Sequence, residues 1–306
     1  MVKSIKKIGI EPSVLGQRLS SISWKICRAV ILLGFFYLMF YPLLHMASTV
    51  FRDAEDFRDP SIYLITKHYS LDNLKYAIEY LDYWKNLVYS TEIAVGSAVL
   101  QTVSCALAGY SFARFNFKGK KIAFAIMIAT IIVPPQTTLL SLFSVVRKLN
   151  LLNTVGAFWV QAALGSSLRA GLFVFIYHQF FKGLPTDLEH AAAIDGCTPL
   201  GTFFKVMLPN VVPGIVTVFF FSVVWHFNDN FVTKYLSLEK PTLAYALDNF
   251  RSAIEKVSGS TLKFDIMTAQ GIIQAGSLLT LLPMLILYFF LQKQLREGVA
   301  RTGIVG

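Results

Sequence analysis

Charged, nucleophilic and metal-binding side chains are scarce in this chain. Of its 306 residues only 15% are charged, 3 are cysteine and 5 are histidine. The cysteines follow neither a disulfide framework nor the spacing of a metal site, and we expect them to be inert. The histidines are scattered, without the nucleophile, base and orienting group of a catalytic site. A G-x-x-x-x-G-K-[ST] loop is also absent, which excludes a phosphate-binding loop of this kind in the chain.

Apolar residues make up most of the sequence instead. Hydrophobic residues account for 55% of the chain, and its mean hydropathy is +0.56. Soluble domains are rarely so apolar, whereas helical membrane proteins commonly are. The net charge of +10 is concentrated at the chain ends and in one short loop. Since basic clusters beside apolar runs set membrane topology, we attribute this charge to orientation in the bilayer and expect no nucleic-acid partner.

Six apolar runs are long enough to cross a bilayer as helices. These expected spans are residues 26–50, 87–113, 122–146, 154–181, 211–232 and 266–291. The segments 1–25 and 293–306 and the loop 114–121 are basic, whereas residues 51–85 are acidic. The sequence therefore predicts an all-α membrane protein, with a six-span domain at residues 26–292 and both termini in the cytoplasm.

Several expected spans contain helix-breaking or polar residues. Pro134 and Pro135 interrupt the third span because prolines lack a backbone donor, and either a cavity-lining joint or a simple packing kink is consistent with them. Arg169 lies inside the fourth span, where a charge is costly unless it is paired or faces water. The candidate pathway or gating residues are Pro134, Pro135, Gln136, Asn228 and Asp229.

The rest of the chain is organised around residues 184–209, the coupling loop, between the fourth and fifth spans. Thr186 and Glu189 predict a capping box at the start of a short helix. Gly196 predicts a left-handed residue that ends this helix. Thr198 and Pro199 predict the start of a second helix. The small alanines between them permit close approach of another protein, although an ordinary loop fits the spacing equally well.

The order of residues in this loop resembles the EAA loop of ABC-importer permeases, in which a coupling helix sits in a cleft of the ATPase subunit. The residues that carry the resemblance are Ala191, Ala192, Asp195, Gly196, Gly201, Phe204, Leu208 and Pro209. Two positions differ, since His190 stands at the motif glutamate and Cys197 at the usual alanine. Glu189, one residue earlier, is the candidate to supply the missing carboxylate.

The resemblance extends over nearly the whole chain and is to the carbohydrate-uptake branch, which includes the smaller permease subunit of the maltose transporter. It rests on the segments YPLL at 41–44, YSLDN at 69–73, GYSFARF at 109–115, VPPQ at 133–136 and LNLLNT at 149–154. In addition, Phe227-Asn228-Asp229 stands at the family's Trp-Asn-acidic element. The resemblance implies a multi-pass permease of the bacterial cytoplasmic membrane that moves a sugar or oligosaccharide.

The same resemblance implies an assembly, which composition alone does not. Its partners would be a second homologous permease in a heterodimer, two ABC ATPase subunits, an extracytoplasmic solute-binding protein, the sugar and the lipid bilayer. ATP and Mg²⁺ would be bound by the ATPase subunits, so we expect no cofactor in this chain and no enzymatic activity of its own. The alternatives are a permease for a non-sugar solute, or an intramembrane enzyme built on Arg169, His226 and Asp229.

Overall fold

The computed structural model describes residues 12–261 and 266–302. Across these ranges the ordered elements are all helices, and the only strand-like pairing is an isolated bridge between Arg52 and Tyr69. The all-α fold expected from the sequence is therefore confirmed.

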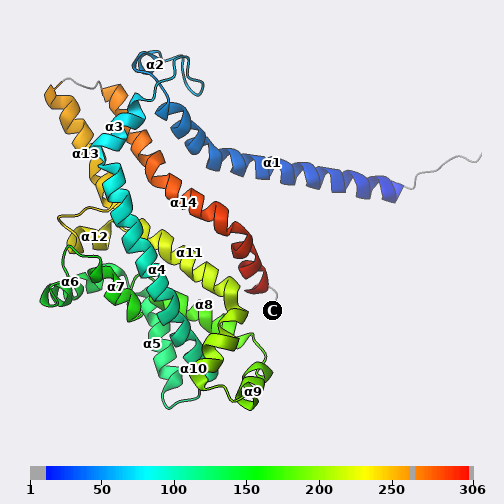
Figure 1. The fold of residues 1–306 in the computed structure, drawn as a ribbon. Coiled ribbons are helices and arrows are strands. Elements are labelled where there is room, and N and C mark those ends of the chain that lie inside the picture. Colours follow the sequence, from blue (N-terminus) through cyan, green and yellow to red (C-terminus); the bar gives the residue numbers. More distant parts are fainter. Residues whose placement is uncertain (1–11, 262–265, 303–306) are drawn as a thin grey trace, which may run out of the picture.

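Four long helices form the frame of the molecule (Figure 1). They are α1 (Pro12–Val50), α4 (Tyr83–Arg114), α11 (Val212–Phe227) and α14 (Ile266–Thr302). The helical stretches long and apolar enough to cross a bilayer are Ser23–Val50, Tyr83–Arg114, Pro199–Phe227 and Thr268–Arg296. They correspond to the first, second, fifth and sixth expected spans.

The third expected span is sharply bent rather than mildly kinked. Its pieces are α5 (Lys120–Ile132), the 3₁₀ turn η1 (Pro135–Thr138) and α6 (Leu139–Lys148), and the direction of the chain changes by 103° between them. Val133 and Pro134 are both extended, with ψ of 121° and 135°. Each of these residues precedes a proline, which disfavours helical backbone at that position and so fixes the bend.

The fourth expected span is also broken, into α7 (Gly156–Ala163) and α8 (Ala170–Lys182). The 13 residues of α8 rise about 20 Å, less than the roughly 30 Å of the hydrocarbon core. Among the described residues, four helices pass the length test for a span, or five if the bent α5–α6 pair counts as one. The expected number of six is reached only by counting the broken α7–α8 pair as well.

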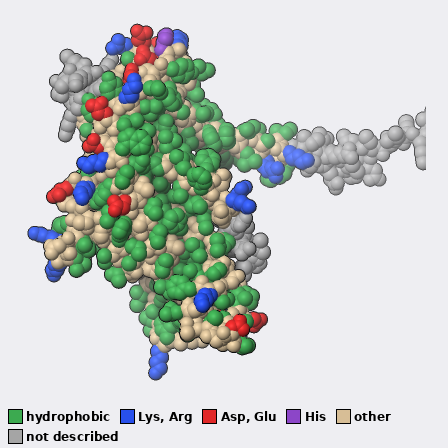
Figure 2. All heavy atoms as spheres, in the orientation of Figure 1, with side chains coloured by type: hydrophobic (Ala, Val, Ile, Leu, Met, Phe, Trp, Pro, Cys, Tyr) green, Lys and Arg blue, Asp and Glu red, His purple; other side chains and the backbone are tan. Residues whose placement is uncertain are grey.

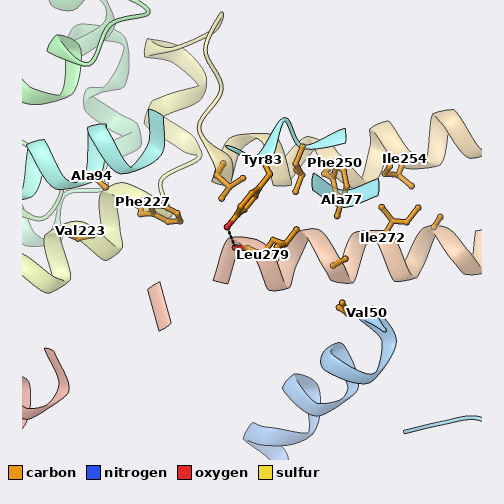
Figure 3. Close-up of a cluster of buried hydrophobic side chains, with 14 of the residues drawn as sticks. Val50, Ala77, Tyr83, Ala94, Val223, Phe227, Phe250, Ile254, Ile272 and Leu279 are labelled. Atoms are coloured by element: carbon orange, nitrogen blue, oxygen red, sulfur yellow. Dashed lines mark hydrogen bonds between the residues drawn. The ribbon is translucent and has the colours of Figure 1, made fainter. Parts of the chain in front are cut away.

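Helix α4 lies in the middle of the bundle and packs on α7, α8 and α11. Helix α14 packs on α11, on α3 (Asp72–Tyr80) and on α13 (Leu243–Thr261). Figure 3 shows the apolar cluster at this end, where the Tyr83 hydroxyl donates a 3.2 Å hydrogen bond to the carbonyl of Leu279.

One buried carboxylate contributes to the structure of the acidic segment after α1. Asp56, in α2 (Ala54–Arg58), is 2% exposed and accepts the backbone N–H groups of Lys67 and His68 at 2.7 and 2.9 Å. The His68 ring lies 2.8 Å away. Burial acts to raise the pKa of Asp56, but these donors outweigh it and hold that pKa below its usual value.

Apolar side chains cover much of the outside of the molecule. Figure 2 shows them over the middle of the visible face, with most charged groups at its ends and edges. Helix α1 leads away from the other helices, and the side chains of its apolar stretch, from Trp24 to Leu44, are largely exposed in the isolated chain (Figure 1). An apolar surface of this extent is typical of a protein surrounded by lipid.

Candidate functional site

The coupling loop folds into α9 (Asp187–Ile194), α10 (Pro199–Thr202), the π turn η2 (Phe203–Met207) and the 3₁₀ turn η3 (Pro209–Val211). Gly196 has φ of +76°, as the sequence predicted. Its N–H donates to the carbonyl of Ala193 at 3.1 Å, and the Cys197 N–H donates to Ala192 at 2.9 Å. This pair of bonds is a Schellman motif, which ends α9 and sets the direction of the chain into α10.

The start of the second helix is also as expected. The Thr198 hydroxyl accepts the N–H of Gly201 at 3.1 Å, and Pro199 is the first helical residue. Gly201 suits this cap because a Cβ at its position would lie only 3.1 Å from the Thr198 oxygen. Pro209 has no N–H and its ring crowds the preceding turn, which here widens into η2.

The predicted capping box at Thr186 is wrong. Thr186 has helical backbone angles and its side chain caps nothing, while Glu189 turns toward α4 instead. The Tyr110 hydroxyl donates a 2.7 Å hydrogen bond to Glu189 Oε1, and Arg114 Nε lies 3.3 Å from Oε2. Arg114 also donates to the carbonyl of Leu184 at 2.6 Å. A charged acceptor gains more from these partners than from a local backbone N–H, so Glu189 ties the coupling loop to its own chain.

The surface that the coupling loop presents outward is apolar in the middle. Ile194 is 86% exposed, Leu200 65% and Phe204 49%, and His190 and Ala191 of α9 are exposed as well. We call these five residues the coupling face. The sequence also placed Ala192 on this face, but Ala192 is 4% exposed and is directed into the molecule.

The other predicted loop residues occupy its ends. Asp195 is exposed at the C-terminus of α9, Pro209 is exposed, and Gly201 and Leu208 are half-buried. The buried Phe203 and Met207 join the loop to the core between α4 and α8.

A second candidate site lies where the two broken spans meet. Two adjoining cavities of about 530 and 420 Å³ are both lined by Pro134, Pro135 and Arg169, and the smaller one is also lined by Gln136 and Asp229. The structure thus brings together four of the five pathway candidates. The fifth, Asn228, lines neither cavity, and its side chain donates to the carbonyl of Val224 at 2.8 Å.

Asp229 has a structural role that its sequence position did not reveal. Its carboxylate accepts the N–H groups of Val232 and Thr233 at 3.2 and 2.9 Å and the Thr233 hydroxyl at 3.1 Å. It therefore caps the start of α12 (Phe231–Leu236) while lining the smaller cavity. None of the hydrogen bonds among the described residues joins Arg169, His226 and Asp229, the three groups of the enzyme alternative.

Side chains of α4 satisfy the carbonyls freed by the break between α7 and α8. Gln101 Nε2 donates to the carbonyl of Leu168 at 2.9 Å, and the Ser104 hydroxyl donates to that of Ala162 at 2.7 Å. Irregular backbone at membrane depth requires such partners. Neither residue belongs to a motif of the sequence, although a glutamine inside an apolar span is a visible signal.

Gln101 belongs to a buried polar network, which consists of Gln101, Ser167, Ser222 and His226. The Ser222 hydroxyl donates to Gln101 Oε1 at 2.6 Å, and the His226 Nδ1 lies 2.8 Å from the Ser222 carbonyl. Since a carbonyl only accepts, Nδ1 carries a proton, and Nε2 lies 2.7 Å from the Ser167 hydroxyl. The network joins α4, α11 and the break between α7 and α8.

Known proteins match this chain over most of its length. The family described as "Binding-protein-dependent transport system inner membrane component" matches residues 106–300. An arabinooligosaccharides transport system permease protein of Halalkalibacterium halodurans is 30% identical over 280 residues, which cover 90% of this chain and 95% of the relative. A maltodextrin transport system permease protein of Bacillus subtilis is 27% identical over 287 residues, which cover 92% of this chain and 96% of the relative.

The fold has a match among solved structures as well. A chain of a bacterial ABC transporter involved in the import of the acidic polysaccharide alginate aligns with a TM-score of 0.76 and 18% identity. The alignment covers 90% of this chain and 97% of that one. The two chains therefore share a fold.

Proposed function

This chain belongs to the family of binding-protein-dependent transport system inner membrane components, and we infer that its cargo is a sugar or oligosaccharide. It is a permease subunit, so ATP is hydrolysed by separate subunits of the importer. The observation that carries the inference about cargo is the full-length similarity to permeases named for arabinooligosaccharides and maltodextrin. The similarity supports the permease function and gives no support to the intramembrane enzyme.

The proposed assembly contains a second, homologous permease, two ABC ATPases that bind ATP and Mg²⁺, and an extracytoplasmic binding protein. The exposed apolar length of α1 supports burial against lipid and the second permease. The broken third and fourth spans support a pathway shared with that subunit, since non-helical backbone at membrane depth occurs where it lines a cavity or contacts protein.

The coupling loop and the basic loop 114–121 lie at the same end of the bundle, at the lower edge of Figure 1, and α2 lies at the other end. This arrangement supports a cytoplasmic position for the coupling loop and an outer position for the acidic segment. Both termini are then cytoplasmic in the proposed topology.

In the proposed mechanism, closure of the ATPases moves the coupling face, and α4 carries this movement to the cavities. Glu189 holds the loop to Tyr110 and Arg114 near one end of α4. Gln101 holds the break between α7 and α8 about 20 Å away, since 13 residues separate Gln101 from Arg114. A rigid helix tied at both places supports a coupled change between inward-facing and outward-facing states.

Reconstitution of the complete importer in liposomes tests the proposed function. Sugars and oligosaccharides, each with the binding protein, are screened for stimulation of ATP hydrolysis, with amino acids and polyamines as the comparison. We expect stimulation by a saccharide. Stimulation only by a non-sugar solute would overturn the carbohydrate assignment and keep the permease.

A further inference from the structure

Arg169 is held in an unusual backbone conformation beside the two cavities. Its φ of +59° lies in the left-handed region, which is unfavourable for a residue with a Cβ. The two residues before it are fixed by the polar network, because Ser167 bonds His226 and the Leu168 carbonyl accepts from Gln101. The surrounding structure thus fixes the backbone position of Arg169.

Among the described residues the guanidinium has no acidic partner. Within the part of the chain that the structure describes, no carboxylate oxygen lies within 4 Å of it. It lies over the Trp225 ring, 5.6 Å from the centroid. Such stacking engages the flat face of the group and leaves the N–H donors around its edge available.

The larger cavity offers one charge and several neutral polar groups. Of the described residues that line it, Arg169 is the only charged one, and the other polar side chains are those of Thr130, Thr138, Gln161, Ser166, Ser167 and His226. Asp229 lines the smaller cavity, but three hydrogen bonds direct its carboxylate to the start of α12.

Arg169 is exposed in the isolated chain and lies within the fourth expected span, which makes its charge significant. It precedes α8, so it lies about 20 Å from Lys182 at the coupling-loop end of the helix. An unpaired arginine at such a depth is expensive unless it faces water or an anion, and residues of this kind mark substrate pathways.

We propose that Arg169 binds the carboxylate of an acidic saccharide, so that the cargo of this importer is a uronic-acid oligosaccharide. The inference rests on the proposed function and specifies the substrate class. The guanidinium edge matches a carboxylate with two parallel N–H bonds. The hydroxyl and amide groups around the cavity donate within the chain, and their oxygens can accept hydrogen bonds from sugar hydroxyls.

The test uses the complete importer in liposomes with oligosaccharides matched in length, galacturonate against galactose and glucuronate against glucose. We expect uptake of an acidic member of a pair. Arg169→Gln should reduce that uptake by at least about tenfold, the effect of losing hydrogen bonds to a charged group. Uptake by Arg169→Lys should lie between that of the wild type and that of Arg169→Gln, because lysine keeps the charge without the bidentate geometry. Arg147→Gln, an exposed arginine of α6 outside both cavities, should transport normally.

The outcomes separate this inference from the function on which it rests. Uptake of neutral sugars only, or normal uptake of the acidic sugar by Arg169→Gln, overturns the role of Arg169 and leaves a sugar importer. Absence of uptake for every saccharide overturns the proposed function itself. If Arg169→Gln no longer co-purifies with the second permease, Arg169 pairs with that subunit instead of the cargo, and the inference is wrong.

Discussion

Tyr110 and Glu189 lie 79 positions apart in the chain, yet the Tyr110 hydroxyl donates a 2.7 Å hydrogen bond to the Glu189 carboxylate. Tyr110 is in the last turns of α4 and Glu189 is in the first turn of α9. The contact is reinforced by Arg114, whose side chain is only 9% exposed. It makes the coupling loop part of the same rigid unit as the central helix.

Removal of this contact should weaken coupling while the protein still assembles. Tyr110→Phe keeps the ring contacts with Phe115, Phe181 and Phe203 and deletes only the hydroxyl. We expect sugar-stimulated ATP hydrolysis to fall several-fold, since a hydrogen bond to a charged group contributes about 1.5–3 kcal/mol. Glu189→Gln should have a similar effect, and the double variant should be little worse than either. Additive losses would show that the two residues act independently.

The bend at Pro134 and Pro135 should matter for transport more than for assembly. Replacement of both with alanine restores two N–H donors and permits helical backbone at Val133 and residue 134. Leu139 and Val146 of α6 remain buried, so the complex should still form. We expect slower uptake with unchanged co-purification of the second permease, and Pro60→Ala in the outer segment serves as the control. Loss of assembly would identify the bend as a packing feature only.

Local signals in the sequence were sufficient for the corner of the coupling loop. A glycine after an alanine-rich helix, followed by Thr198-Pro199, gave both the left-handed residue and the second cap. The alternation of basic and acidic segments between the expected spans can likewise be recognised without knowing any tertiary contact. These features depend on a few neighbouring residues, so they can be recognised from the sequence alone.

Long-range partners account for what the sequence did not reveal. Thr186 and Glu189 do not form the expected capping box because Glu189 contacts Tyr110 and Arg114, and no local sequence pattern indicates these contacts. Gln101 reaches the Leu168 carbonyl 67 positions away, and Ser222 reaches Gln101 across 121 positions. Pro134 and Pro135 predicted a break in the third span, but the 103° angle between α5 and α6 is given by the structure and not by the local sequence.

Membrane orientation can be tested by cysteine labelling in a variant that lacks Cys27, Cys105 and Cys197. Glu55→Cys is suitable for the outer segment because Glu55 is exposed, whereas the neighbouring Asp56 is buried. We expect an impermeant thiol reagent to label Glu55→Cys in intact cells and to label Lys118→Cys only after permeabilisation. The reverse pattern would invert the proposed topology.

The outer segment should show a defined pH dependence. Because the pKa of Asp56 is lowered, its carboxylate stabilises this segment fully at pH values above 3.8, the usual pKa. This stabilisation is lost as the pH falls through the lowered pKa. The hydrogen bond and charge of Asp56 raise the pKa of His68. The stabilisation that protonated His68 contributes to this segment is therefore fully present below pH 6.5 and is lost as the pH rises through the raised pKa.

Deuterium exchange at the backbone amides of Lys67 and His68 measures this effect. At pH 6 these amides should exchange faster in Asp56→Asn than in the wild type. Asp59→Asn, which removes a carboxylate that accepts neither of these amides, should leave them unchanged. Equal exchange in all three proteins would show that Asp56 does not hold the segment.

The proposal that the coupling loop transmits ATPase closure is tested most directly at Gly196. A Cβ at Gly196 would meet no atom within 4 Å, so a substitution acts through its backbone alone. Valine should cost about 1–2 kcal/mol in the left-handed conformation, whereas asparagine tolerates it better. We expect Gly196→Val to assemble with the second permease but to bind the ATPase poorly, and Gly196→Asn to behave nearly as the wild type. The measurement is ATPase co-purification together with hydrolysis stimulated by sugar and binding protein in liposomes. Both should be lost in Gly196→Val, and wild-type values for both in that variant would show that the coupling loop does not transmit ATPase closure.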